Sequence, residues 1–208
     1  MLITNLQNGY TKDNKNCSQN HNLQNDKKQY FCNMNIKHVS LLLIAFLLLS
    51  FSEHKNLSKK IDKEIKTAFN VEAYSYKDIV ISPELTSQLP ATFKQNSLVE
   101  IKTNDTLLGF AYMGKAPSKT DEFDYLVLLD KDLIVIKTKV LAYREDYGSE
   151  IGSKRWLKQF IGKTQHDDLR YGDNIAAISG ATISVRSMTN AMNNLLKSLH
   201  VLHSKNIL

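Results

Sequence analysis

The sequence has few cysteines, and both lie near its N-terminus. Cys17 and Cys32 are the only two among 208 residues. The chain after residue 32 therefore has no thiol for a disulfide, a thiolate metal site or a nucleophile. It also has no cysteine through which a lipid anchor could be attached.

The sequence signatures of common hydrolytic and nucleotide-binding sites are missing as well. We find no HExxH metal motif, no GxSxG elbow, no Walker pattern and no GxGxxG fingerprint. Asp167 and Asp168 could form an acid pair, but a solvated turn or a helix start is the favoured interpretation. The histidines after residue 53 lack metal-ligand spacing; they are His54, His166, His200 and His203. Hydrolytic chemistry therefore has little support, with a Ser/His/Asp triad outside a GxSxG elbow as the alternative, and no metal site is expected.

A strong excess of one charge is also missing from most of the chain. The formal net charge is +6, from 27 basic and 21 acidic residues. Five of the basic and two of the acidic residues precede Glu53, which leaves 22 basic and 19 acidic residues after them. This mild excess does not support a nucleic-acid partner.

No apolar run reaches the length of about 20 residues that a membrane-spanning helix needs. The longest run, VSLLLIAFLLLSF at 39–51, instead suits the core of a secretory signal. Lys37 precedes it, and the small residues Ser50 and Ser52 stand at its end, at the cleavage-determining positions. We interpret 34–52 as a signal peptide, with an uncleaved membrane anchor as the alternative. The Asn- and Gln-rich segment 1–33 is then a disordered tail or an extension from a misassigned start codon.

The rest of the chain predicts a single α+β domain, in which helices flank an antiparallel meander. Apolar residues every four positions predict a helix near 57–69, and strands are expected at 71–82, 98–102, 107–113, 123–129 and 133–142. A polar loop at 144–150 and a helix at 151–161 follow. We divide this part into a region at 53–96, with helix, strand and loop, and a ligand-binding domain at 97–202.

The end of the chain combines a short strand, a tight turn of small residues and a helix. The strand is expected at 174–178, and the helix at 183–199 has one apolar face, which includes Ile183 and Val185. Free N–H groups and the dipole at the start of this helix could bind an anion, most naturally a phosphate. Gly180 permits close backbone approach, and Thr182 adds a hydroxyl. A plain helix cap is the alternative, because Ser, Thr and Gly are common there.

The S-G-A-T sequence at 179–182 resembles the flavinylation motif of the FMN-binding domain family. Members include the periplasm-facing FMN subunits of sodium-pumping NADH:quinone reductase and of Rnf-type complexes. The family order is a meander, a Glu-x-x-Gly loop, a helix, the S-G-A-T turn and a final helix, and Glu145 to Gly148 stand at the loop position. The resemblance covers roughly Leu98 to Leu199. This chain departs from the family pattern at Ala176, where an acidic residue is frequent, and at Asp146 and Tyr147 within the loop.

The resemblance implies FMN as cofactor, bound through its phosphate to Thr182 by a flavin transferase. It implies that the helix start holds the phosphate and that nearby residues surround the ring. Tyr147, Trp156 and Phe160 are candidates, with core packing as the alternative, which is favoured for Phe160. The expected cofactor-binding residues are Thr182, Ser179, Gly180, Ala181, Ser184, Glu145, Gly148 and Trp156.

The function that the resemblance implies is electron relay by an exported flavoprotein. Its partners would be membrane redox proteins, and its place the periplasm or the outer face of the cytoplasmic membrane, with contact to the membrane surface as an option. An electron-transfer subunit is favoured over a self-sufficient enzyme, and no catalytic residue is assigned. Two alternatives stay open: an exported module that binds another phosphate ligand without redox chemistry, and a small stand-alone flavin reductase.

Overall fold

The computed structural model describes residues 56–208. The expected signal or anchor at 34–52 and the segment 1–33 lie outside the described residues. Within the described part, no helix is both long and apolar enough to cross a lipid bilayer.

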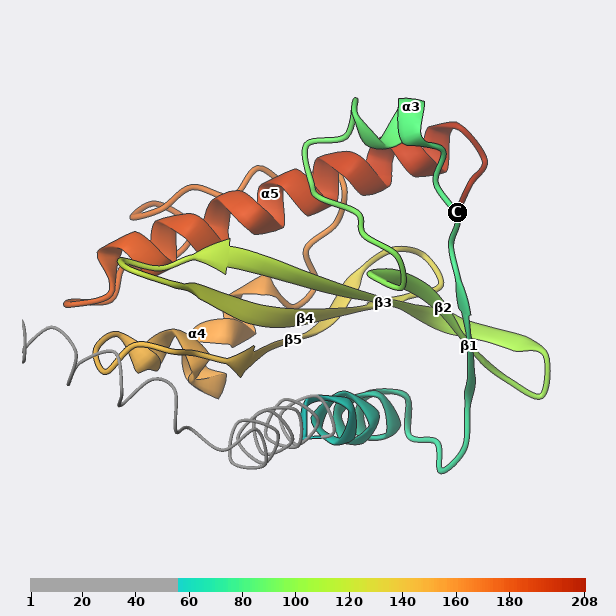
Figure 1. Ribbon diagram of the computed structural model, residues 1–208, viewed down its shortest axis with the longest axis horizontal. Helices are drawn as coiled ribbons and strands as arrows, with labels where there is room; N and C mark the ends of the chain where they lie inside the picture. Colours follow the sequence, from blue (N-terminus) through green and yellow to red (C-terminus); the bar gives the residue numbers. More distant parts are fainter. Residues whose placement is uncertain (1–55) are drawn as a thin grey trace, which may run out of the picture. The chain divides into compact units, whose positions relative to one another are not determined.

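A five-stranded antiparallel sheet forms the centre of the domain, with strand order β1-β2-β3-β4-β5 (Figure 1). Sequential order in an all-antiparallel sheet is a meander, so the predicted α+β fold is confirmed. Asn104 and Asp105 join β2 to β3 with φ of 46° and 61°, as a two-residue hairpin turn of the twist-matched type requires. The strands are β1 (Ser75–Asp78), β2 (Leu98–Thr103), β3 (Thr106–Pro117), β4 (Glu122–Asp130) and β5 (Val135–Ala142).

Helices cover both faces of the sheet, because the central strands are apolar on both sides. Along β4, Phe123 and Tyr125 belong to one core cluster, while Leu126 and Leu128 belong to the other. The long helix α5 (Thr182–Ser204) packs on the first cluster with a row of fully buried residues spaced by three or four: Val185, Met188, Met192, Leu195, Leu196, Leu199 and Leu202. The helix at 56–69 packs on the second cluster through Leu57, Ile61, Ile65 and Phe69.

Two predicted elements are shorter or more broken than expected. The strand expected at 71–82 is limited to β1, and Ser82 instead caps the short helix α3 (Pro83–Thr86) by accepting from the N–H of Leu85. The helix expected at 151–161 consists of three short turns, because Ser153 adopts an extended conformation and caps a new helix. These turns are η1 (Ser149–Gly152), α4 (Lys154–Leu157) and η2 (Lys158–Phe160).

The strand expected at 174–178 is wrong, since only an isolated bridge between Tyr171 and Ile175 forms there. Side chains satisfy the backbone of Ala176 in place of a neighbouring strand. Gln159 Oε1 accepts from its N–H at 2.7 Å, and Trp156 Nε1 donates to its carbonyl at 2.8 Å. The segment that leads to the S-G-A-T turn is therefore held by α4 and η2.

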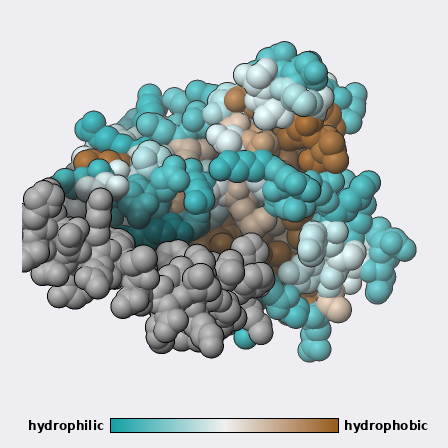
Figure 2. Space-filling view, viewed as in Figure 1, coloured by the Kyte–Doolittle hydropathy of each residue, from teal (hydrophilic) through white to brown (hydrophobic). Residues whose placement is uncertain are grey.

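The exposed surface differs between the two ends of the sheet. In the view of Figure 2, apolar surface gathers below α3 and over the middle of the molecule. Val80, in the connection between β1 and α3, is 85% exposed. The end where α5 begins is more hydrophilic in this view, and all the predicted site residues except Trp156 line a pocket there.

Candidate functional site

The first turn of α5 begins without a side-chain cap. Its N-cap residue is Ala181, whose methyl group cannot accept a hydrogen bond, and Thr182 is the first helical residue. The alternative that Thr182 serves as an ordinary capping residue is therefore not what the structure shows. Thr182 is exposed, and the N–H groups around it form the positive end of a helix dipole.

A tight turn delivers the chain to this helix start. The N–H of Ala181 donates to the carbonyl of Ile178 at 3.2 Å, and Gly180 sits in the turn with φ of +80°. This left-handed conformation favours glycine. A Cβ at Gly180 would meet no atom within 4 Å, so the space beside the turn is open.

The Glu145–Gly148 loop lies directly against this turn. Gly148 has φ of +84°, and a Cβ built on it would lie 3.3 Å from Cβ of Ala181 and 2.8 Å from Oη of Tyr143. Gly148 is therefore required both for its backbone conformation and for the close approach. The structure brings together two motifs that are more than 30 residues apart in the chain.

Glu145 fixes the loop to the β3–β4 turn through hydrogen bonds. Its Oε1 accepts hydrogen bonds from Ser118 Oγ at 2.7 Å, from the N–H and hydroxyl of Thr120, and from the N–H of Asp121. The Ser118 hydroxyl and then these backbone donors lower the pKa of Glu145 to about 2. The carboxylate is thus ionised at neutral pH and ties the β3–β4 turn to the loop after β5.

Together these segments line one open pocket of about 840 Å³, which we call the α5 pocket. This volume lies within the range of small-molecule and cofactor sites. The exposed apolar side chains of Tyr147 and Ile183 lie at the pocket, at 83% and 51% exposure. Ile183 was expected on the buried face of the helix, and the structure corrects this. The lining residues are Lys119, Thr120, Tyr143, Arg144, Glu145, Asp146, Tyr147, Gly148, Glu150, Ser179, Gly180, Ala181, Thr182, Ile183 and Ser184.

The charges of the α5 pocket are mixed. Arg144 donates to the carbonyl of Glu122 and pairs with Asp124, so its guanidinium is engaged with β4. Lys119 has no carboxylate within ion-pair distance among the described residues, which leaves its ammonium group available to an anion. No cluster of three or more potential metal ligands occurs in the described part of the chain.

Trp156 and Phe160 do not line the α5 pocket. Trp156 is 6% exposed, Phe160 is fully buried, and their ring centroids are 5.2 Å apart in an edge-to-face contact. The indole N–H of Trp156 is already bonded to Ala176. In this structure Trp156 therefore supports the segment before the turn, whereas Tyr147 is the aromatic candidate that reaches the pocket.

Comparison with known protein families gives a match at this part of the chain. Residues 119–197 match a family model described as the FMN-binding domain. These residues resemble an FMN-binding domain. The matched range includes every residue that lines the α5 pocket. It confirms the resemblance seen in the sequence, and FMN is the cofactor that the match supports.

Among solved structures, the chain is similar to NqrC of Shewanella oneidensis. The identity is 15%, the alignment covers 66% of this chain and 91% of that one, and the TM-score is 0.48. No curated protein sequence matches the chain significantly.

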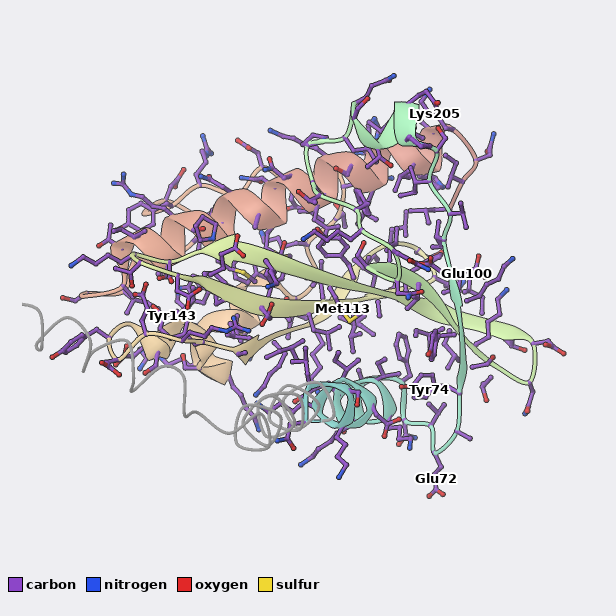
Figure 3. All side chains as sticks on the ribbon, viewed as in Figure 1. Glu72, Tyr74, Glu100, Met113, Tyr143 and Lys205 are labelled. Atoms are coloured by element: carbon purple, nitrogen blue, oxygen red, sulfur yellow. The ribbon has the colours of Figure 1, made fainter. Side chains whose placement is uncertain are left out.

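Several residues that line the pocket were not predicted as site residues from the sequence, and Tyr143 and Lys119 are two of them. Tyr143 directly follows β5, at the side of the sheet where α5 begins (Figure 3). Its hydroxyl is within 3.0 Å of both the Tyr147 carbonyl and Ser184 Oγ. A tyrosine directly after a strand and two residues before the Glu-x-x-Gly loop is the only sequence signal for it.

Proposed function

We propose that this chain is an exported flavoprotein that holds FMN in the α5 pocket and relays electrons with membrane redox proteins. The observation that carries the proposal is the FMN-binding domain match over 119–197, which includes the complete pocket lining. Bound FMN supplies one- and two-electron redox chemistry, and the protein supplies binding, orientation and electrostatics.

The proposed phosphate position is the start of α5. The uncapped first turn offers N–H donors and a positive dipole end, both of which favour an anion. Lys119 adds a charge without a carboxylate partner among the described residues. The open space beside Gly180 leaves room for a phosphate close to the backbone.

The proposed attachment point is Oγ1 of Thr182, which is exposed at the pocket. A flavin transferase would form the bond between this oxygen and the FMN phosphorus of FAD. The phosphoanhydride bond of FAD breaks, AMP leaves, and the hydroxyl proton passes to solvent, so no electrons are exchanged. Thr182 is suited to this role because its hydroxyl is at the first helical position and does not serve as the cap.

The ring would lie near the loop end of the pocket. Tyr147 offers an exposed aromatic face there, and Ile183 offers an apolar side chain from the helix. Ser179, Gly180, Ala181 and Gly148 would contribute backbone surface. Support for export comes from the apolar run at 39–51, which suits the core of a secretory signal.

The experiment is co-expression of the full chain with a flavin transferase, followed by intact mass and visible absorption under denaturing conditions. We expect a mass increase of one FMN less one water, together with flavin absorption that stays with the unfolded protein. Thr182→Ala should lose both, whereas Thr106→Ala, an exposed threonine of the β2–β3 hairpin, should keep both. A colourless wild-type chain of unmodified mass that also fails to take up added FMN would overturn the proposal.

A further inference from the structure

The hydroxyl of Tyr143 links the Glu145–Gly148 loop to the first turn of α5. It lies 3.0 Å from the carbonyl oxygen of Tyr147 and 3.0 Å from Oγ of Ser184. A carbonyl can only accept, so the single phenol proton is donated to Tyr147. The bond to Ser184 must then run the other way, with Ser184 as the donor.

This direction fixes what Ser184 can do. Its side chain is 3% exposed, and its one proton is directed to Tyr143. Ser184 therefore has no proton left for a phosphate in the α5 pocket. Its contribution to the pocket is to connect the helix to the loop and not to donate to a phosphate.

The Tyr143 ring is itself fixed to the sheet. Its centroid lies 5.9 Å from that of Phe123, a fully buried residue of β4. The next residue, Arg144, is tied to Asp124 on the same strand. The hydrogen-bond chain from Ser184 through Tyr143 to Tyr147 thus starts on α5, passes through a side chain anchored on the sheet and ends on the loop.

The close approach of Gly148 depends on the same hydroxyl. A Cβ at Gly148 would lie 2.8 Å from Tyr143 Oη and 3.3 Å from Cβ of Ala181. The loop can therefore approach both residues only because Gly148 has no side chain. Since Tyr147 immediately precedes Gly148, the phenol holds the one exposed aromatic residue of the loop at the pocket that also contains Thr182.

We propose that Tyr143 is a positioning residue of the α5 pocket, which holds the loop against α5 so that Tyr147 stands ready to contact the planar ring of a phosphate-bearing ligand. This inference rests on the proposed function for the identity of that ligand. It assigns Tyr143 no contact with reacting atoms. Its effect is exerted through the positions of Tyr147 and Ser184.

The test compares Tyr143→Phe with Tyr112→Phe in the full chain. Tyr112 is a matched control, because its hydroxyl donates to a backbone carbonyl, that of Thr92, at 2.9 Å and lies outside the α5 pocket. Both variants remove one phenol oxygen that bonds to a carbonyl. Hydrogen exchange of the flavin-free chains should be faster over both 145–150 and 182–187 in Tyr143→Phe, and in neither segment in Tyr112→Phe.

The second measurement is the rate of flavin loading by the transferase. One neutral hydrogen bond corresponds to a change of about fivefold, so Tyr143→Phe should load about fivefold more slowly and Tyr112→Phe at the wild-type rate. Ser184→Ala should slow loading in the wild-type background, but much less in the Tyr143→Phe background, because its acceptor is already lost.

The outcomes separate the two proposals. If the wild-type chain loads flavin and Tyr143→Phe loads at the same rate, the positioning role is overturned while the proposed function stands. Unchanged exchange in the two segments, or full additivity of the Tyr143 and Ser184 substitutions, also overturns the positioning role. A wild-type chain that takes no flavin overturns the proposed function itself.

Discussion

Replacement of Gly148 by alanine tests the contact between the loop and the S-G-A-T turn. Gly148 has φ of +84°, and the new methyl group would lie 2.8 Å from Tyr143 Oη and 3.3 Å from Cβ of Ala181. Gly180 and Gly172 have similar φ of +80° and +78°, but a Cβ on either meets nothing within 4 Å. These two glycines therefore report the cost of the backbone conformation alone.

The expected magnitudes follow from this difference. A left-handed conformation costs a non-glycine residue roughly 1–2 kcal/mol, which is the whole loss in the free energy of unfolding expected for Gly180→Ala and Gly172→Ala. Gly148→Ala must in addition displace the phenol. Each of the two bonds of Tyr143 contributes about 0.5–1.5 kcal/mol, so the total loss should be about 2–5 kcal/mol.

Urea denaturation followed by circular dichroism measures all three variants on one scale. Gly148→Ala should be less stable than both control variants by at least about 1 kcal/mol, since it disturbs two hydrogen bonds of Tyr143. An equal decrease in the free energy of unfolding for the three variants would refute the argument. It would show that the loop can move away from the turn and from Tyr143 at no cost in stability.

Three further predictions concern the supports of the site. Glu145→Gln should lower the melting temperature above pH 4.5. The difference from wild type should shrink as the pH falls from 4.5 towards 2, because a carboxylate whose pKa is lowered to about 2 loses its stabilising effect over that range. If thermal melts show a constant difference down to the lowest pH, the assigned hydrogen bonds are contradicted. Trp156→Phe should lower the free energy of unfolding by about 0.5–1.5 kcal/mol and speed hydrogen exchange over 174–180, since the bond to the Ala176 carbonyl is lost. Unchanged exchange in this segment would show that the indole does not hold it. Ile65→Ala should lower the free energy of unfolding in urea by about 2–5 kcal/mol, because this 3% exposed residue anchors the helix at 56–69 on the sheet. A decrease no larger than that of Lys63→Ala, at an exposed position of the same helix, would show that the helix does not pack on the core.

The meander could be predicted from the sequence because its signals are local. Asn104 and Asp105 mark a hairpin turn by their tolerance of positive φ, and alternating apolar residues mark the strands on either side. The buried row of α5 is also visible as a helical period. The S-G-A-T turn and the Glu-x-x-Gly loop could be paired because both belong to one family pattern.

The errors occur where tertiary contacts override local pattern. The segment 174–178 is β-like in composition, but Gln159 and Trp156 satisfy the backbone of Ala176, so no strand forms. Core packing was the alternative to a ring contact for Trp156, and its 6% exposure and its bond to Ala176 depend on contacts that the local pattern does not show. The role of Tyr143 depends on a bond to a residue 41 positions later, which no local pattern shows.

The most direct test of the account is the location of the flavin on the chain. Trypsin cleavage after Arg170 and Arg186 releases one peptide, 171–186, that contains Ser179, Thr182 and Ser184 together. Fragmentation of this peptide from the co-expressed protein, under conditions that preserve the phosphoester, measures which hydroxyl carries the modification. The account predicts FMN on Thr182; an unmodified peptide, or FMN on either serine, would contradict it.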